Sequence, residues 1–312
     1  MVTTSSAWIP PAGITTHAGK PISSDLEFFA APPIEIGKIT SAYSTLTVST
    51  QPLSTAQRLF RALLWGIGFT VVTALLVTAF HIPLPWNVLT GLVVGAIAAA
   101  LIYTYILVFY QTCSYVGEQG IAEYSINGSR SAEPESSIMR FQDAANLYTS
   151  QTRRYKNGAY QGTDFRYTWQ MPGRKPFEIW GTHHAQQGLP DDTSNWHFAN
   201  AAEAAWSNHL LRVINEQLQR LGYVEFPMQQ ANPQAVRVGQ GFLEFVLKDG
   251  STQTVAVTDM KDIKLQSGSF YFAHKDARWW SGKGKYEFMY SNLPNAQLFL
   301  LCLNQLAGIR WS

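Results

Sequence analysis

The longest pattern in the chain is an apolar tract in which no Asp, Glu, Lys or Arg occurs between Ala62 and Gly117. Pro83 and Pro85 interrupt this tract, and proline is excluded from helix interiors because it lacks an N–H and clashes with the preceding turn. We therefore predict two helices, over residues 59–80 and 86–110. Each helix reaches the ~20 apolar residues that a hydrocarbon layer of ~30 Å requires, so the pattern indicates a transmembrane hairpin over residues 58–112.

One face of the second predicted helix carries almost no side-chain bulk. Gly91, Gly95 and Ala99 recur at every fourth position, and such a stripe lets another helix approach closely. The stripe could pack against the first helix, which contains Gly66 and Gly68, or it could form the contact of a homodimer. The sequence leaves both interpretations open.

The distribution of positive charge predicts the orientation of the hairpin. Arg58 and Arg61 flank the first helix, whereas the turn at residues 81–87 contains no Lys or Arg. Because positively charged flanks stay on the cytoplasmic side, we predict a multi-pass protein of the inner (cytoplasmic) membrane with both termini in the cytoplasm.

The first 57 residues are rich in Ser, Thr, Ala and Pro and show no sustained apolar period. We predict that residues 1–57 form a mostly extended or disordered cytoplasmic tail. Within this tail, residues 26–36 place two aromatic residues and two isoleucines around the extended dipeptide Pro32-Pro33. This segment could dock on the folded part of the chain, bind a partner or lack a fixed structure.

The remainder of the chain alternates strand and helix patterns. Asn157-Gly158 and Asp249-Gly250 separate runs of alternating residues, and both dipeptides tolerate the positive φ angles of tight hairpin turns. Apolar residues then recur at helical spacing over residues 199–221, where Gly222 gives a stop signal, and over residues 294–306, where Pro294 marks the predicted start. We expect antiparallel hairpins followed by a helix in each half.

Two short segments of the first half have similar counterparts in the second half. Residues 119–124 (QGIAEY) resemble residues 240–245 (QGFLEF), and residues 141–147 (FQDAANL) resemble residues 257–263 (VTDMKDI). The order is the same in both halves, and a predicted helix follows each pair. We therefore predict an internal duplication, with one domain over residues 113–225 and a second over residues 226–312.

Three segments carry a family resemblance. They are the Gln-Gly-x-x-Glu-aromatic strand opening, the Asp-x-x-Asp/Asn-Ile/Leu segment and Asn292-Leu293-Pro294-Asn295 before the last helix. Residues 113–310 resemble the pleckstrin-homology-like (PH-like) domains of uncharacterised membrane-anchored bacterial proteins. The resemblance implies an α+β protein in which two transmembrane helices precede tandem antiparallel β-barrels or sandwiches, each closed by a C-terminal helix. It implies no activity and no cofactor.

Composition narrows the range of partners. The chain contains 23 basic and 21 acidic residues and has a net charge of +2, which is too balanced to indicate nucleic-acid binding. The two cysteines, Cys113 and Cys302, have neither metal-site spacing nor a disulfide framework. This cysteine usage suits a reducing cytoplasm.

The sequence carries no recognisable catalytic motif. The residues with the best ligand chemistry for zinc or another divalent ion are His183, His184, Asp191, Asp192 and His197. No His-Glu-x-x-His helix is present, and Gly181, Gly188 and Pro190 indicate a loop, so we predict no metal site there. The chain also lacks a Gly-x-Ser-x-Gly elbow and a P-loop. We predict that the protein is not an enzyme.

Basic residues gather near two predicted hairpin turns. The first group surrounds Asn157-Gly158, and the second surrounds a tryptophan pair. The first group is Arg153, Arg154, Lys156 and Arg166, and the second is Arg278, Trp279, Trp280, Lys283 and Lys285. Near an anionic leaflet, each basic side chain contributes about 1 kcal/mol of attraction. We expect these residues to contact anionic lipid or a protein partner, although ordinary solvated loops have the same composition.

These patterns together favour a non-enzymatic membrane protein whose tandem PH-like module binds anionic lipid headgroups or a protein at the membrane, as a scaffold. The alternative is a membrane-resident subunit or an immunity-type protein that captures one specific protein partner. A third hypothesis, a metal-dependent enzyme, would use the residues of the loop at 183–197. The expected partners are membrane lipids, a protein or a second copy of the chain, and not nucleic acid.

Overall fold

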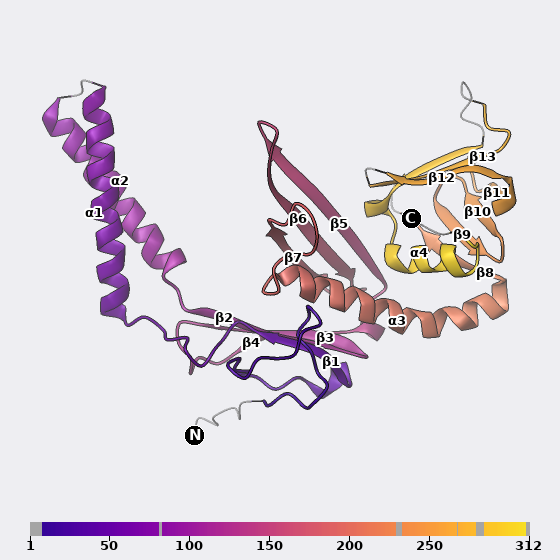
Figure 1. Cartoon of the computed structure of the whole chain (residues 1–312), viewed down its shortest axis with the longest axis horizontal. Coiled ribbons are helices and arrows are strands. Elements are labelled where there is room, and N and C mark those ends of the chain that lie inside the picture. The colour runs from indigo at the N-terminus through magenta and orange to yellow at the C-terminus, as the bar shows by residue number, and fades with distance from the viewer. Residues whose placement is uncertain (1–7, 81–82, 229–232, 267, 279–283, 310–312) are drawn as a thin grey trace.

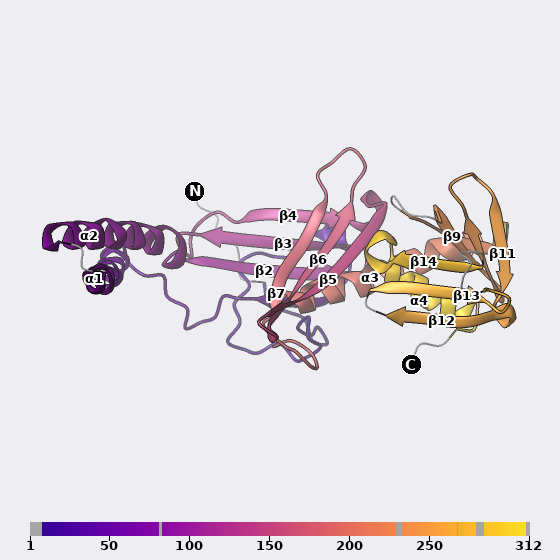
Figure 2. The ribbon, with the colours of Figure 1, turned by 90° about the horizontal axis from the view of Figure 1, so that it is seen from above.

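The computed structural model describes residues 8–80, 83–228, 233–266, 268–278 and 284–309. Within these residues the chain has a mixed α+β fold, in which two apolar helices accompany four antiparallel sheets (Figure 1). The apolar hairpin, a first β-rich unit and a second β-rich unit follow one another along the long axis of the molecule (Figure 2).

The two apolar helices are α1 (Thr55–Ala79) and α2 (Leu84–Leu101), the latter continued by a π-helical turn, η2 (Ile102–Ile106). Ser54 and Gln57 form a capping box that starts α1, so this helix begins four residues earlier than predicted. The second helix ends at Ile106, before the predicted residue 110, because Tyr110 already pairs in a sheet. By length and composition, both helices could cross a membrane.

Apolar side chains on α1 and α2 face outward except where the two helices meet. In the most apolar 18-residue stretch of each span, 11% of the residues are buried in the first span (Thr55–Ala79) and 17% in the second (Pro85–Ile106). A Cβ added at Gly95 would lie 2.5 Å from the carbonyl oxygen of Gly66, and one at Gly91 would lie 2.7 Å from that of Thr70. The small-residue stripe that ends at Ala99 therefore packs α2 against α1 within one chain.

The apolar hairpin is inserted between two paired strands of one sheet. The strands of this sheet, in the order β1-β2-β3-β4, are β1 (Ile39–Ser44), β2 (Tyr110–Gly117), β3 (Gly120–Asn127) and β4 (Glu135–Arg140). Strand β1 precedes α1 and runs antiparallel to β2, which follows η2, so that Ser44 lies opposite Cys113. The chain leaves the sheet, forms the hairpin and returns to the neighbouring position in the same sheet.

The segment before the hairpin is packed, so the prediction of a mostly extended or disordered tail over residues 1–57 is wrong for its described part. Phe28 and Ile36 are 1% and 0% exposed and join a core with Cys113 and Tyr115. The Tyr115 hydroxyl donates a hydrogen bond to the Ala30 carbonyl. The segment at residues 26–36 therefore docks on its own chain, which was one of the three interpretations left open.

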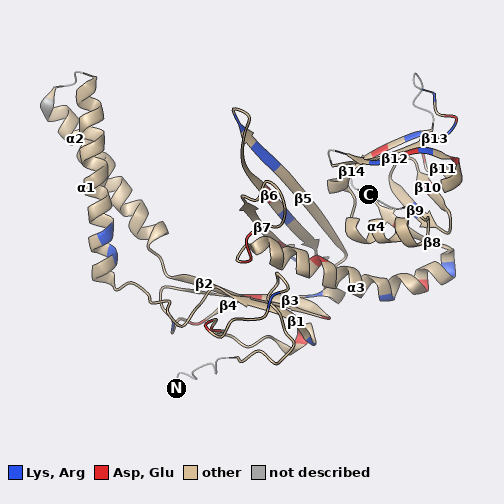
Figure 3. Cartoon of the chain, in the orientation of Figure 1, with Lys and Arg blue, Asp and Glu red and all other residues tan. Residues whose placement is uncertain are grey.

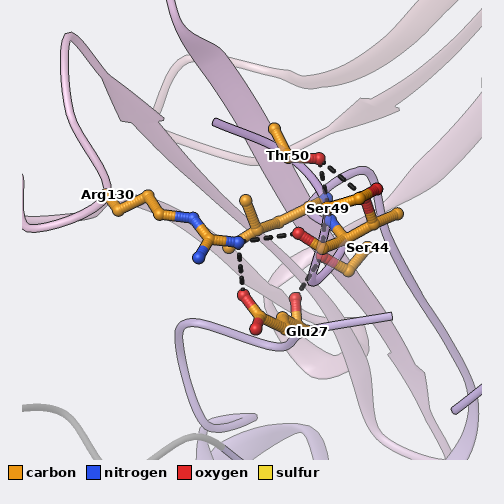
Figure 4. Close-up of polar contacts among 7 residues, drawn as sticks. Glu27, Ser44, Ser49, Thr50 and Arg130 are labelled. Atoms are coloured by element: carbon orange, nitrogen blue, oxygen red, sulfur yellow. Dashed lines mark hydrogen bonds and ion pairs between the residues drawn. The ribbon is translucent and has the colours of Figure 1, made fainter. Parts of the chain in front are cut away.

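Polar contacts fix the same segment on the sheet. Arg130, in the loop after β3, donates from one guanidinium nitrogen to Glu27 and to the Thr47 carbonyl, both at 2.7 Å (Figure 4). The half-buried His17 ring bridges Ser41 of β1 at 2.8 Å and Ser114 of β2 at 2.9 Å. Burial lowers the pKa of His17 to about 3, so its imidazole is neutral at physiological pH.

The first unit is completed by a three-stranded sheet and a long helix. These elements are β5 (Asn146–Lys156), β6 (Ala159–Gln170), β7 (Phe177–His183) and α3 (Asn195–Leu221). Buried aromatic side chains fill the space between them, including Trp169, Phe198 and Trp206. Helix α3 ends where predicted, because Gly222 takes a left-handed conformation with φ 75°.

The second unit repeats this order of elements. Its four-stranded sheet contains β8 (Tyr223–Pro227), β9 (Ala235–Gly239), β10 (Phe242–Val246) and β11 (Thr252–Ala256), and its three-stranded sheet contains β12 (Met260–Gln266), β13 (Ser269–His274) and β14 (Lys285–Met289). Helix α4 (Ala296–Gln305) follows, and Asn295 rather than Pro294 precedes its first residue. The core is rich in phenylalanine, including Phe270, Phe272 and Phe299.

The predicted domain boundaries change in two places. The first unit includes residues before the hairpin, because β1 lies beside β2. The second unit begins at β8, since β8 pairs with β9, whereas a boundary between residues 225 and 226 would cut this strand. The paired sequence segments occupy corresponding places: Gly120 and Phe242 start the third strand of each unit, and the 3-10 turns η3 (Phe141–Asp143) and η4 (Val257–Asp259) connect its two sheets.

Candidate functional site

The hairpin β5–β6 presents the first group of predicted contact residues. Asn157 and Gly158 have φ values of 51° and 79°, which confirms the predicted tight turn. The side chains of Arg153, Arg154 and Lys156 near this turn are exposed, as is that of Arg166 on the returning strand. We call these four residues the basic hairpin.

The charges of the basic hairpin are directed mainly at solvent. Arg154 forms an ion pair with Asp164 at 2.9 Å, whereas Arg153, Lys156 and Arg166 have no ion pair among the described residues. Tyr155, between the basic residues, is 54% exposed. Figure 3 shows the basic hairpin on the side of the sheet β1–β4 from which α1 and α2 project.

The second predicted group is described only in part. Trp279, Trp280 and Lys283 lie outside the described residues. Arg278 precedes that gap, and Lys285 begins β14. Nearby Lys275 forms an ion pair of 2.7 Å with Asp259, so its charge is already compensated. The structure therefore supports a patch of basic residues more fully in the first unit than in the second.

The His and Asp side chains of the loop at residues 183–197 contact separate partners. His184 Nδ1 lies 3.0 Å from the Gln161 carbonyl. The Nε2 atom of the buried His197 lies 3.1 Å from the Pro190 carbonyl. Asp192 pairs with Lys20 at 2.5 Å. Among the described residues, no three His, Cys, Asp or Glu side chains come together in a group that could hold a metal ion.

The two cysteines are buried and free. Burial raises the pKa of the Cys113 thiol to about 11 and that of Cys302 to about 12. Both thiols are therefore protonated at neutral pH and pack as small apolar groups, which gives neither of them the thiolate that nucleophilic chemistry requires.

A cavity with a polar lining lies where the two units meet. A cavity of about 560 Å³ opens between β5, β6 and α3 of the first unit and the β12–β13 turn, β14, η5 (Tyr290–Asn292) and α4 of the second. We call it the inter-unit cavity. It is lined by Thr149, Ser150, Gln151, Thr152, Tyr167, Asn200, Glu203, Gly268, Met289, Tyr290, Ser291 and Gln297.

Glu203 is the notable group in this lining. Its side chain is on α3, the residue is 7% exposed, and its Oε1 atom has no hydrogen-bond partner among the described residues. Burial raises the pKa of the Glu203 carboxyl to about 7. Burial, and secondarily the charge of Glu203, also raise the pKa values of Tyr167 and Tyr290, so both phenols remain protonated hydrogen-bond donors.

Asn295 fixes the two walls of the cavity relative to each other. Its Oδ1 atom accepts hydrogen bonds from Trp206 Nε1 at 2.7 Å and from the Leu147 backbone N–H at 3.0 Å. Its own backbone N–H donates to the Leu147 carbonyl at 2.7 Å. Asn295 adopts φ 55°, a left-handed conformation that asparagine tolerates better than most residues. The start of α4 is thereby tied to β5 and α3.

Sequence reasoning did not identify Glu203, although a signal was present. The apolar residues that recur at helical spacing over residues 199–221 include Trp206 and Leu210, and Glu203 lies one turn before Trp206 on the same face. An acidic residue on the buried stripe of an amphipathic helix indicates either an internal partner or a site. The residues opposite it, from the second unit, could not be read from the sequence.

Comparisons with known proteins add no family. No protein-family model matches the chain, and no match was found among curated proteins.

Proposed function

We propose that this chain is an integral inner-membrane protein that holds a tandem PH-like module at the cytoplasmic surface and acts as a non-enzymatic binding scaffold. The observation that carries this proposal is the insertion of the apolar hairpin between the paired strands β1 and β2. A hairpin attached through both of its ends to one sheet restricts the orientation of the module more strongly than a single flexible tether would.

Two observations support the PH-like assignment. Each unit consists of a four-stranded antiparallel sheet, a three-stranded antiparallel sheet and a terminal helix, in that order. The paired sequence segments at residues 119–124 and 240–245 lie at the third strand of each unit. A duplicated domain accounts for both observations.

The predicted orientation is supported by the charges at the base of the hairpin. Arg58 donates to the Tyr103 carbonyl at 2.9 Å, and its guanidinium carbon lies 4.6 Å from the centre of the Tyr103 ring. Arg58 and Arg61 are at the end of α1 that joins the β-rich units, and positive charge is retained in the cytoplasm. Aromatic and cationic side chains are common at this depth of a membrane.

The basic hairpin favours anionic lipid headgroups as the surface that the first unit contacts. Three of its four basic side chains lack an ion pair among the described residues, and Tyr155 adds an exposed amphipathic ring. Basic residues close to an anionic leaflet contribute about 1 kcal/mol each. The hairpin projects from the same side of the first sheet as α1 and α2 (Figure 3), which is the side of the bilayer in this proposal.

The membrane part of the proposal is tested by fractionation. The full chain should stay in the membrane pellet after alkaline carbonate extraction and should enter the supernatant only with detergent. A protein that is released without detergent would contradict the proposal, because the exposed apolar faces of α1 and α2 would then need another cover.

The lipid contact is tested with a soluble variant in which a Gly-Ser linker replaces residues 54–107, so that β1 and β2 remain paired. We expect this variant to sediment with phosphatidylglycerol-containing liposomes and not with phosphatidylcholine liposomes. Changing Arg153 and Lys156 to Ala should weaken the partition of this variant into phosphatidylglycerol-containing liposomes about 30-fold, since two basic contacts contribute about 2 kcal/mol.

The matched control changes Arg212 and Arg220 to Ala, because both are exposed basic residues on α3, outside the basic hairpin. If both double variants lose binding equally, net charge rather than the basic hairpin is responsible. If the parent binds no liposome and a single protein copurifies in stoichiometric amount with the full chain, the alternative of a partner-binding membrane subunit replaces the lipid contact.

A further inference from the structure

We propose that the inter-unit cavity binds a small organic cation, a hydroxylated amine without a phosphate or carboxylate group. This inference goes beyond membrane attachment and is independent of the lipid contact. It rests on the buried Oε1 atom of Glu203, which has no hydrogen-bond partner among the described residues, and on the polar lining that surrounds it.

The charge of the cavity lining indicates the sign of the charge on the ligand. Glu203 is the one described lining residue with a formal charge, and no Lys, Arg or His lies among the others. An ionised carboxylate that is removed from water needs a counter-charge or several donors, whereas Oε1 of Glu203 has neither among the described residues. An ammonium group provides both a positive charge and donors, since it carries two or three N–H bonds.

The same lining argues against anionic ligands. A phosphate or carboxylate would be placed near Glu203 without a cation to balance it, and like charges at short distance are unfavourable in a partly desolvated site. Nucleotides, phosphorylated sugars and intact phospholipid headgroups are therefore disfavoured. The cavity is thus distinct in its chemistry from the basic hairpin, which suits anionic groups.

The rest of the lining indicates a ligand with several hydroxyl or amide groups. Hydroxyl and amide side chains come from both units, with Thr149, Ser150 and Gln151 on β5 and with Ser291 and Gln297 in the second unit. A volume of about 560 Å³ lies within the range of sites for small organic molecules. Because both units form the walls, a bound molecule would bridge them.

Three probes with the same polyol chain and different charge test the proposal. D-glucamine is cationic, sorbitol is neutral and gluconate is anionic. Titrations of the full chain in detergent micelles, followed by ligand-observed NMR, should show saturable binding of D-glucamine, with sorbitol at least about tenfold weaker, as expected for loss of a charge-assisted contact. Gluconate should not bind.

The Glu203→Gln variant keeps the shape of the side chain and removes its charge. It should bind D-glucamine about tenfold more weakly and should reduce the difference between D-glucamine and sorbitol. Glu216→Gln is the matched control, because Glu216 is an exposed residue of the same helix. This control should bind all three probes like the parent protein.

The pH dependence gives a test that needs no variant. Binding of D-glucamine to the parent should strengthen between pH 6 and pH 8, as Glu203 loses its proton, while binding of sorbitol should stay constant. Equal binding of D-glucamine and sorbitol, absence of D-glucamine binding, or a Glu203→Gln variant that binds D-glucamine like the parent would each overturn the proposal.

Discussion

The two β-rich units are built from the same elements in the same order, yet they differ in how their first two strands are connected. In the second unit β8 ends at Pro227 and β9 begins at Ala235, whereas in the first unit β1 and β2 are separated by the whole apolar hairpin. The same antiparallel pairing exists in both. The comparison shows that strand pairing in this architecture depends on the complementarity of the two strands and tolerates a long insertion at the turn.

The units differ also in their terminal helices. Helix α3 has 27 residues and α4 has 10. The first half of α3 places Phe198 and Trp206 in the core of the first unit, whereas Ile214 near its other end belongs to the core of the second. The additional length of α3 therefore connects two cores, while α4 covers one.

The largest effect is expected from removal of the segment before the hairpin. A chain that begins at residue 109 lacks β1, Phe28 and Ile36, which are buried in the first unit. Burial of each large apolar side chain contributes about 1.5 to 3 kcal/mol, so the loss of these two side chains alone should cost about 3 to 6 kcal/mol and, together with the loss of β1, should unfold this unit. Hydrogen exchange should show protected amides in β9, β10 and β13 and unprotected amides in β2 and β3.

The control keeps the segment and replaces residues 54–107 by a Gly-Ser linker. This variant should retain protected amides in both units. A truncated chain that folds as well as the linker variant would show that the first unit folds without β1. It would contradict the structural similarity between the two units.

The second prediction concerns the connection made by α3. Ile214→Ala should destabilise the second unit by about 3 kcal/mol, because the residue is 9% exposed and its removal leaves a cavity in that core. Val213→Ala, at the neighbouring position with 55% exposure, should change stability by less than about 0.5 kcal/mol. Denaturant unfolding of the linker variant measures both. Equal effects would contradict the assignment of Ile214 to the second core.

The third prediction concerns pH at the junction of the units. The pKa of Glu203 is about 7 in the folded protein and lies near 4.5 when the chain unfolds. A raised carboxyl pKa stabilises the folded state fully below pH 4.5, and this contribution is lost as the pH rises through 7. At pH 8 Glu203→Gln should therefore be more stable than the parent by at most about 3 kcal/mol.

At pH 4 the difference between Glu203→Gln and the parent should nearly vanish, because the Glu203 carboxyl is then mostly protonated in both the folded and the unfolded state. The titratable groups that face Glu203 across the cavity are Tyr167 and Tyr290, and their raised pKa values keep them neutral over this range. Guanidinium unfolding of the linker variant at the two pH values measures the effect. A difference that is constant with pH would show that Glu203 is ionised in the folded state throughout.

The smallest effect is expected in the apolar hairpin. Gly95→Ala places a Cβ 2.5 Å from the backbone carbonyl of Gly66, so α1 and α2 must separate, at a cost of about 1 to 2 kcal/mol. Gly68→Ala is the control, because its added Cβ would have no atom of the described residues within 4 Å beyond the neighbouring backbone of its own helix. Distances between spin labels at the exposed positions Leu64 and Ile97 should increase only in Gly95→Ala. Unchanged distances would indicate that the stripe faces another chain.

Local patterns predicted much of the secondary structure. The uncharged tract with its proline interruption predicts two apolar helices, and Asn157-Gly158 and Asp249-Gly250 predict the turns of β5–β6 and β10–β11. These predictions depend on neighbours a few residues apart, which the sequence displays directly. The basic hairpin was predictable for the same reason, since its residues share one turn.

The candidate cavity was not predictable, because its walls come from segments far apart in the chain. The sequence places Glu203 on the buried stripe of a helix, but the residues facing it, such as Tyr290 and Gln297, are brought there by the packing of the second unit.

The amino-acid sequence by itself determined the apolar helices, the hairpin turns and the order of strands and helix in each half, because hydrophobic period and turn chemistry act over short distances. Only the tertiary structure decided that Ile39–Ser44 joins β2 across the apolar hairpin and that α3 serves two cores. Strand pairing between distant segments depends on complementary surfaces that exist only after the chain has folded, and a short polar strand carries little sign of its partner.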